Sequence, residues 1–358
     1  MKIEEPEVPI LGKQAFVTRQ QPLLNEIAER YGRNALTTCI KVFYGNPLEE
    51  GQHLNDALWG DNPRNAGDPR KNTTVLAGSQ VQNILWRLGV CPRVYAMFEA
   101  TFRDKRVACQ LTDFVEGESS EDINVIYQMQ KKVNELGKDY GFASQSTKMG
   151  CNDVVNGKLV DPQLWAFDKK PYKEIVEQIY YEKGKYGKIY YQNDDELGYH
   201  GGPRHSEDRI GYMQLDKIDF EGKVVWDVGC AGGFFLRYAM KRGAKIAYGL
   251  DMREPLEAAF HAGNFLGYFN IDYVEADLSR GIPTEVPKPD IAFYLSMNYH
   301  ISTPERLFEA DTLIFEDNGK ETRALDHLGE PWTKYYSNIE FVGRGKDHGD
   351  KACYILRK

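Results

Sequence analysis

The feature that most constrains the fold is an alternation of short apolar runs and helical stretches that begins near residue 224. Each apolar run has the length of one buried strand, and the runs cover residues 224–228, 246–250, 271–274, 291–295 and 312–315. The stretches with helical spacing cover residues 233–242, 255–265 and 304–310. Buried strands joined through helices are typical of a parallel sheet with helices on both faces. We therefore expect an α/β fold in this half of the chain.

The end of the chain follows a different pattern. Residues 338–343 and 352–356 are strand-like, and a polar loop without a helix separates them. A connection of this kind joins antiparallel neighbours, because a parallel pair needs a longer crossover. We expect the two strands to form an antiparallel pair at the edge of the sheet.

Two domains are expected from the length and from a change in composition. The chain has 358 residues, of which 42% are hydrophobic and 27% charged, so it can bury more than one globular core. Stretches rich in Gly, Asn, Asp and Pro, such as residues 45–72, lie before residue 170, whereas residues 171–181 are apolar at helical spacing. We place the two domains at residues 1–170 and 171–358.

Composition and charge disfavour several classes of protein. The 53 acidic residues against 45 basic ones give a net charge of −8, which disfavours a protein that coats nucleic acid. The six cysteines include no CxxC pair, which indicates reduced thiols rather than a disulfide framework or a zinc site. No apolar run approaches the roughly 20 residues of a membrane span, and no secretory signal is visible. We expect a cytoplasmic protein without a membrane partner, and no spacing of histidines specifies a metal.

The loop after the first of these strands has the pattern of a nucleoside-binding turn. The strand delivers Asp227, and Gly229, Ala231 and Gly233 then form a tight turn into a helix. Asp251 ends the next strand, where a carboxylate can accept hydrogen bonds from both ribose hydroxyls. Asp227 beside the turn would repel a pyrophosphate but suits a cationic ligand. The pattern therefore predicts a site for a cationic nucleoside.

Residues 195–358 resemble the class I S-adenosylmethionine-dependent methyltransferases. The acidic and glycine motif of that family corresponds to Asp227, Gly229, Ala231 and Gly233, with alanine in the position of the middle glycine. The resemblance implies a Rossmann-like seven-stranded methyltransferase sheet with S-adenosyl-L-methionine as cofactor. It also implies further cofactor-binding residues at the ends of the second, third and fourth strands, namely Asp251, Met252, Asp277, Leu278 and Ser296.

A basic segment precedes the first strand of this half. The carboxylate of adenosylmethionine needs a cation or donors, and arginine supplies a bidentate fork. Arg204 and Arg209 are the two candidates for this role.

Residues that could act on the methyl acceptor follow the fourth strand. In an open α/β sheet the carboxyl ends of the strands face the ligand, so Asn298, Tyr299 and His300 are the catalytic candidates. His300 could act as a general base near neutral pH, and Asn298 could orient the nucleophile. The alternative is that His300 is an ordinary loop histidine. The segment 316–319 leaves the fifth strand at the same edge.

Residues 38–170 bear a weaker resemblance to a protein kinase-like fold. Lys41 resembles the phosphate-pairing lysine, and Asn152 and Asp161 resemble the two metal-binding residues of kinases. No glycine-rich loop precedes Lys41, the following helix offers Gln80 in place of the glutamate that pairs with that lysine, and a threonine stands where the catalytic base belongs. Because phosphoryl transfer needs the base and the metal ligands together, we expect a degenerate α+β kinase-like domain. The alternative is an unrelated α+β domain that contacts the substrate.

These features together predict a methyltransferase that depends on S-adenosyl-L-methionine and O-methylates a small molecule or a glycan. The alternative is a bifunctional or pseudokinase-regulated protein, in which the N-terminal half binds a nucleotide or a partner.

Overall fold

The computed structural model describes residues 1–4, 15–57, 74–120, 122–144, 154–160, 164–167, 169–182, 193–200, 204–298, 300–317, 332–345 and 351–358. The chain divides into two compact units, Met1–Ile175 and Val176–Lys358. The division falls inside helix α4 (Lys169–Glu182), shortly after the boundary expected at residue 170.

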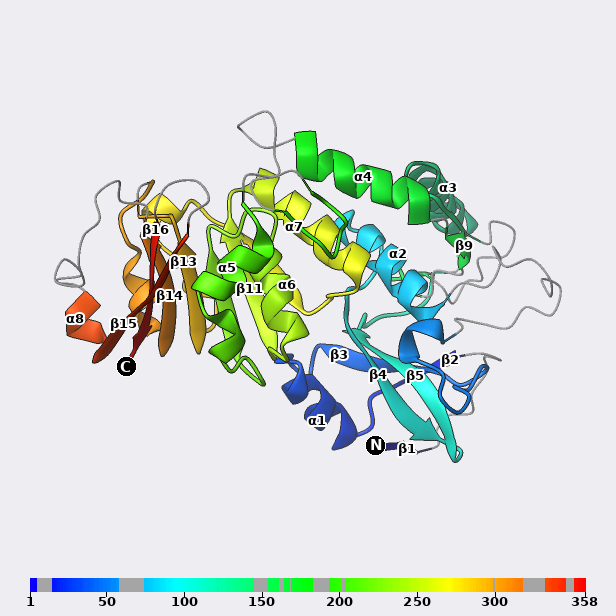
Figure 1. Cartoon of the computed structure of the whole chain (residues 1–358). Coiled ribbons are helices and arrows are strands. Elements are labelled where there is room, and N and C mark those ends of the chain that lie inside the picture. The colour runs from blue at the N-terminus through cyan, green and yellow to red at the C-terminus, as the bar shows by residue number, and fades with distance from the viewer. Residues whose placement is uncertain are drawn as a thin grey trace. The chain divides into compact units, whose positions relative to one another are not determined.

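The second unit is built on one seven-stranded sheet, which confirms the predicted α/β fold (Figure 1). The strand order is β12-β11-β10-β13-β14-β16-β15; the first five are parallel, and β16 runs antiparallel to both of its neighbours. The strands are β10 (Val224–Val228), β11 (Ile246–Asp251), β12 (Ile271–Glu275), β13 (Ile291–Leu295), β14 (Thr312–Asp317), β15 (Asn338–Gly345) and β16 (Lys351–Arg357).

The order of the strands determines where a ligand can bind. The chain moves outward from β10 through β11 to β12, then returns to place β13 on the other side of β10. Ligands of open α/β sheets bind at such a switch point, beyond the carboxyl ends of the strands. The residues that end β10, β11, β13 and β14 therefore meet at one edge.

Two apolar clusters cover the two faces of this sheet. Alternate residues of a strand point to opposite faces, so Val225 and Phe293 belong to one cluster and Trp226 and Tyr294 to the other. The first cluster packs against residues of α6 (Phe234–Lys241) and α7 (Arg253–Leu266) and lies next to α5 (Ser206–Tyr212) and the 3₁₀ turn η5 (Leu215–Lys217). The second packs against η6 (Leu278–Arg280), η7 (Glu305–Glu309) and α8 (Trp332–Tyr335). The helix expected at residues 304–310 is thus a 3₁₀ helix.

The first unit holds a five-stranded sheet of order β1-β4-β5-β3-β2, in which only β1 pairs in parallel. Its strands are β1 (Lys2–Ile3), β2 (Ala15–Thr18), β3 (Thr38–Phe43), β4 (Val94–Phe102) and β5 (Lys105–Asp113). In the residues that the structure describes, the helical elements before α4 are α1 (Leu23–Arg30), η1 (Leu54–Asp56), α2 (Val75–Arg87) and α3 (Ile123–Tyr140). Two short antiparallel pairs follow, β6 (Phe142–Ser144) with β9 (Leu164–Phe167) and β7 (Val154–Val155) with β8 (Lys158–Leu159).

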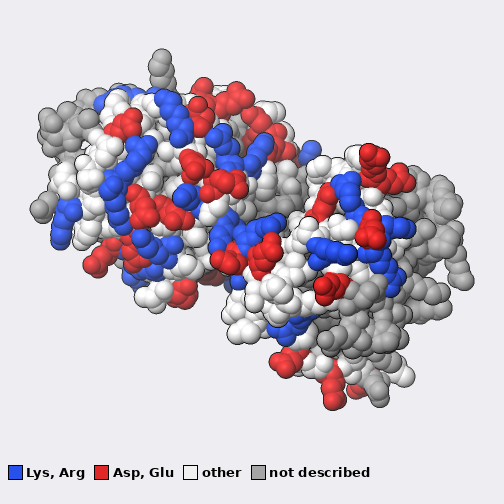
Figure 2. All heavy atoms as spheres, turned by 90° about the horizontal axis from the view of Figure 1, so that it is seen from below, with Lys and Arg blue, Asp and Glu red and all other residues white. Residues whose placement is uncertain are grey.

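The surface carries both signs of charge. On the face drawn in Figure 2, Lys and Arg side chains are interspersed with Asp and Glu. None of the helices in the described ranges is long and apolar enough to cross a bilayer.

Candidate active site at the strand ends

The loop between β10 and α6 has the backbone conformation that its glycines predict. Gly229 and Gly233 have φ angles of 82° and 71°, in the left-handed region that favours glycine. A Cβ atom on Gly229 would overlap the side chain of Met297, so a glycine here lets the loop after β13 approach closely. Ala231 also has a positive φ of 46°, which is strained for a residue with a Cβ.

Asp251 connects this loop to the end of β11. One carboxylate oxygen accepts a hydrogen bond from the backbone N–H of Ala231 at 2.9 Å, and the other accepts from the N–H of Met252 at 2.7 Å. A carboxylate oxygen can accept more than one hydrogen bond, so this arrangement can also accept from a pair of vicinal hydroxyls. The geometry supports Asp251 as a ribose-binding residue.

Asp227 lies buried at the end of β10. The pKa of its carboxyl is raised to about 7, mainly because of burial. The positive charge of Arg209 lowers this pKa, and the negative charge of Asp251 raises it. A cation placed next to Asp227 would favour its ionised form. The expectation that Asp227 faces a positively charged ligand stays a prediction, with which this burial is compatible.

The raised pKa of Asp227 predicts a pH dependence of stability. Between the ordinary pKa of 3.8 and about 7, the folded protein binds this proton more tightly than the unfolded chain does. The contribution of Asp227 is therefore fully present below pH 3.8 and is lost as the pH rises through about 7, by roughly 1.4 kcal/mol for each pH unit between the two values. We expect the free energy of unfolding of Asp227→Asn, relative to the unmodified protein, to rise across this range in urea titrations. A constant difference between the two proteins would contradict the raised pKa.

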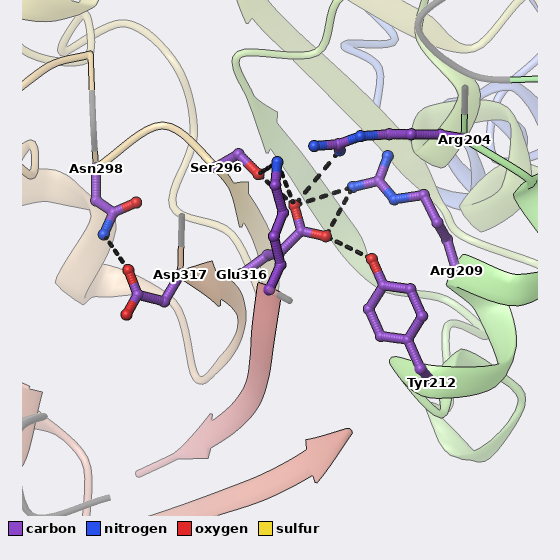
Figure 3. Close-up of polar contacts among 8 residues, drawn as sticks. Arg204, Arg209, Tyr212, Ser296, Asn298, Glu316 and Asp317 are labelled. Atoms are coloured by element: carbon purple, nitrogen blue, oxygen red, sulfur yellow. Dashed lines mark hydrogen bonds and ion pairs between the residues drawn. The ribbon is translucent and has the colours of Figure 1, made fainter. Parts of the chain in front are cut away.

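A second buried carboxylate, Glu316, ends β14 and is surrounded by cations. Arg204 and Arg209 approach its oxygens at 3.5 and 3.4 Å, and Lys351 at 3.8 Å. The phenol of Tyr212 donates at 2.5 Å, and the hydroxyl of Ser296 also donates to the carboxylate. Figure 3 shows the arginines and Tyr212 on one side of Glu316 and Ser296 on the other. We call these six residues the Glu316 cluster.

The cations decide the charge of Glu316. Burial alone raises the pKa of this carboxyl, but Arg209 and Arg204, with hydrogen bonds from Ser296 and Tyr212, outweigh it and lower the pKa below its ordinary value. Burial raises the pKa of Tyr212, which therefore keeps its proton and donates it. Glu316 is thus ionised at neutral pH and holds the cations together.

Helix α5 and strands β13, β15 and β16 bring the cluster together around the end of β14. Tyr212 ends α5 and lies against Gly343 and Gly345 of β15, where a Cβ atom would lie 2.4 Å from the carbonyl oxygen of Tyr212 and 2.8 Å from its ring, respectively. Lys351 begins β16, and Ser296 follows β13 with a φ of 62°. The edge hairpin thus supplies both a cation and the close approach that Tyr212 needs.

A buried ion pair holds the segment before α5 onto the glycine loop. Arg237 of α6 donates to the carbonyl of Gly232 at 2.6 Å and pairs with the buried carboxylate of Asp194. The N–H of Asn193 donates to the carbonyl of Arg204 at 2.7 Å. This pair anchors the chain close to the point where Arg204 enters the cluster.

The remaining predicted residues lie in less enclosed positions. Asp277 is exposed, accepts hydrogen bonds from Ser279 and pairs with Arg280 at 3.1 Å, whereas Leu278 is buried. Asn298 donates to Asp317 at 2.8 Å, away from the Glu316 cluster (Figure 3). His300 is exposed in a turn, and its backbone N–H donates to the carbonyl of Met297. Tyr299, Asn152 and Asp161 lie outside the described residues.

Sequence reasoning missed two members of the cluster. Lys351 and Tyr212 stand in no motif, and they lie 55 positions from Ser296 and 104 positions from Glu316, respectively. The sequence did contain one signal for the cluster, because Glu316 directly follows the strand-like run 312–315. Within the described parts of the chain, no group of three or more His, Cys, Asp and Glu side chains could hold a metal ion.

Comparison with known proteins shows what part of this site is similar to. A family model described as a methyltransferase domain matches residues 226–317. The C-terminal unit contains a methyltransferase domain. The matched segment runs from β10 to the end of β14, so it includes Asp227, Asp251, Ser296 and Glu316.

Curated relatives and solved structures are also similar to part of the chain. A ubiquinone biosynthesis O-methyltransferase of Citrobacter koseri is 27% identical over 139 residues, which are 38% of this chain and 56% of that protein. The chain thus spans about half the length of the curated relatives it matches. An Aquifex aeolicus SAM-dependent methyltransferase (TM-score 0.31, 22% identity) covers 42% of this chain and 93% of its own. The match with the bifunctional kinase–methyltransferase WbdD (TM-score 0.39, 16% identity) covers 52% of this chain and 46% of that one.

Proposed function

We propose that the C-terminal unit is an S-adenosyl-L-methionine-dependent O-methyltransferase that acts on a small molecule or a glycan. The observation that carries the proposal is the hydrogen bond between the Asp251 carboxylate and the Ala231 N–H, because it holds against the glycine loop the carboxylate that would bind a ribose. The curated relatives are named as O-methyltransferases, which supports the class of reaction.

The polar side chains at the strand ends fit the cofactor. Asp251 would accept hydrogen bonds from the ribose hydroxyls, and the buried Asp227 would face its positive groups. Arg204 or Arg209 would bind its carboxylate, and Met252, Asp277 and Leu278 would flank its adenine. Bound there, the cofactor supplies a methyl group on a sulfonium, which is an electrophile. The protein's own task is to hold the acceptor in line with that methyl and to exclude water.

The need for a general base depends on the acceptor. A neutral hydroxyl has to lose its proton, and His300 after β13 is the candidate that accepts it, with Asn298 and Tyr299 beside it in the sequence. An acceptor that is already an anion needs no base.

Calorimetric titration of the full chain with S-adenosylhomocysteine tests the proposal. A complex with one ligand per chain supports it. An absence of binding under conditions where circular dichroism shows a folded protein would contradict it.

The position of Lys41 supports the alternative function, a kinase-like role of the N-terminal unit. Lys41 of β3 is buried and lies directly opposite Gln110 of β5, whose side chain donates to Ser79 of α2 at 2.5 Å. Residues directly opposite in adjacent strands share a face, so Lys41 points toward α2, as a phosphate-pairing lysine would. We propose that this unit is a degenerate kinase-like domain that binds a nucleotide or a partner.

We expect this unit to transfer no phosphoryl group. Gln80 and Gln82 of α2 are amides, so the helix offers no carboxylate there to pair with Lys41. Incubation with γ-labelled ATP and Mg²⁺ should label neither the chain nor a generic acceptor above the level of Lys41→Met. Weak ATP binding in calorimetry is compatible with this expectation. Metal-dependent labelling that disappears in Lys41→Met would contradict it and support the bifunctional alternative.

A further inference from the structure

The glycine loop between β10 and α6 is held at two consecutive residues. The N–H of Ala231 donates to the carboxylate of Asp251 at 2.9 Å. The carbonyl of the next residue, Gly232, accepts a hydrogen bond from the guanidinium of Arg237 at 2.6 Å. Gly233 is the N-cap of α6, so the carbonyl of Gly232 lies outside the helical hydrogen bonds, and a side chain of the helix satisfies it instead. Two side chains thus fix the path of the loop.

The loop needs this support because its backbone is strained. Ala231 has a φ of 46°, in the left-handed region that a residue with a Cβ atom disfavours. Such a conformation persists only where the surrounding structure over-determines it. The hydrogen bonds at Ala231 and Gly232 supply that constraint. Without the bond from Arg237, the loop can relax away from the conformation that presents the N–H of Ala231 to Asp251.

Asp194 fixes the guanidinium of Arg237 in turn. The two side chains form an ion pair, and they are 1% exposed for Arg237 and 0% for Asp194. The backbone of Asp194 exchanges two hydrogen bonds with that of Tyr199, at 2.9 and 2.8 Å, so a tight turn holds the residue. Its carboxylate also accepts from the N–H of Leu197 at 3.3 Å. The segment 193–200 therefore places the carboxylate that orients Arg237.

A second ion pair joins the same segment to α6 at the surface. Lys241, one turn further along the helix, pairs with Glu196 at 2.8 Å, and its side chain is 61% exposed. The phenol of Tyr268 donates to the same carboxylate at 3.0 Å. Both ion pairs therefore attach residues 193–200 to α6, but the pair made by Arg237 also reaches the glycine loop.

We propose that Arg237 and Asp194 are positioning residues that set the affinity for the cofactor by holding the glycine loop in its binding conformation. This inference rests on the proposed methyltransferase function. The pair acts through the carbonyl of Gly232 rather than through contact with the nucleoside. Without it the loop relaxes, and the cofactor binds only the fraction of molecules that still adopt the strained conformation. Because a left-handed residue with a Cβ atom is disfavoured roughly tenfold, we expect an affinity lower by about that factor.

The variant Asp194→Asn/Arg237→Met tests the proposal by removing both charges at once. Removal of one partner leaves an uncompensated buried charge, whereas neutral replacement of both partners often leaves the stability nearly unchanged. Glu196→Gln/Lys241→Met is the matched control, because it removes the other ion pair between the same two segments. Each protein is titrated with S-adenosylhomocysteine in a calorimeter and unfolded in urea. We expect the first variant to bind about tenfold more weakly at nearly unchanged stability, and the control to bind like the unmodified protein.

Hydrogen exchange of the ligand-free proteins provides a second readout that does not depend on the cofactor. The amide of Ala231 should exchange about tenfold faster in Asp194→Asn/Arg237→Met, because its hydrogen bond to Asp251 forms less often. The amides of β10 and β13 should exchange at unchanged rates, since the sheet stays intact. If this variant does not fold, Arg237→Lys keeps a charge for Asp194 but loses the fork that also reaches Gly232, and it should show the same changes severalfold.

The outcomes separate this inference from the proposed function. A folded variant with unchanged affinity for S-adenosylhomocysteine would overturn the positioning role. Equal losses of affinity in the variant and in the control would also overturn it, because they would show that attachment of residues 193–200 matters rather than the bond to Gly232. An unmodified chain that fails to bind S-adenosylhomocysteine would instead overturn the proposed function, even if exchange at Ala231 still showed that the pair holds the loop.

Discussion

Replacing Asp251 with alanine is expected to abolish measurable binding of S-adenosylhomocysteine. The carboxylate would accept two charge-assisted hydrogen bonds from the ribose, each worth about 1.5–3 kcal/mol. It also holds the glycine loop through the N–H of Ala231, so its removal loosens the loop that the nucleoside contacts. Together these losses correspond to a decrease in affinity of at least about a hundredfold. The measurement is calorimetric titration of both proteins at the same pH.

Two further variants show whether this loss is specific. Asp251→Asn keeps one acceptor oxygen without the charge, so we expect an intermediate affinity. Asp311→Ala removes an exposed carboxylate that pairs with Lys288 just before β14 begins, at the opposite edge of the sheet, and should bind like the unmodified protein. If Asp251→Ala is folded and binds with unchanged affinity, Asp251 is not the ribose acid.

The sheet and the glycine loop between β10 and α6 were predictable because their signals are local. Each parallel strand is a short apolar run, and Asp227, Gly229 and Asp251 stand at strand ends that the run itself marks. The seven strands of the sheet correspond to the five apolar runs and the two strand-like runs near the end of the chain. The helix expected at residues 304–310 is shorter in the structure, where only Glu305–Glu309 is helical. So short a segment adopts the tighter 3₁₀ geometry.

The Glu316 cluster was not predictable, because it depends on contacts between distant segments. Tyr212 reaches Glu316 only where Gly343 and Gly345 of β15 leave room for its backbone and ring. No pattern within α5 or β15 signals that pairing. Arg204 and Arg209 were predicted as cofactor ligands from their chemistry, yet their contact with a buried glutamate required the fold. The kinase-like interpretation of the first unit stays a prediction, because Asn152 and Asp161 lie outside the described residues.

Replacing Glu316 with glutamine is expected to destabilise the folded protein by about 3–5 kcal/mol, the usual cost of removing one partner from a buried ionic group. Arg204, Arg209 and Lys351 would keep their buried charges without the carboxylate that they share. Glu340→Gln is the matched control, because Glu340 is an exposed carboxylate that pairs with Arg357 at 3.0 Å; it should cost less than about 1 kcal/mol. The measurement is the free energy of unfolding in urea.

The pH dependence of that difference tests its cause. The pKa of Glu316 is lowered in the folded state, so its contribution is present above the ordinary glutamate value of 4.5 and is lost as the pH falls through the lower folded value. The cost of Glu316→Gln should therefore be largest near neutral pH and should shrink in acid. A cost that stays the same at every pH would point to lost packing rather than to charge.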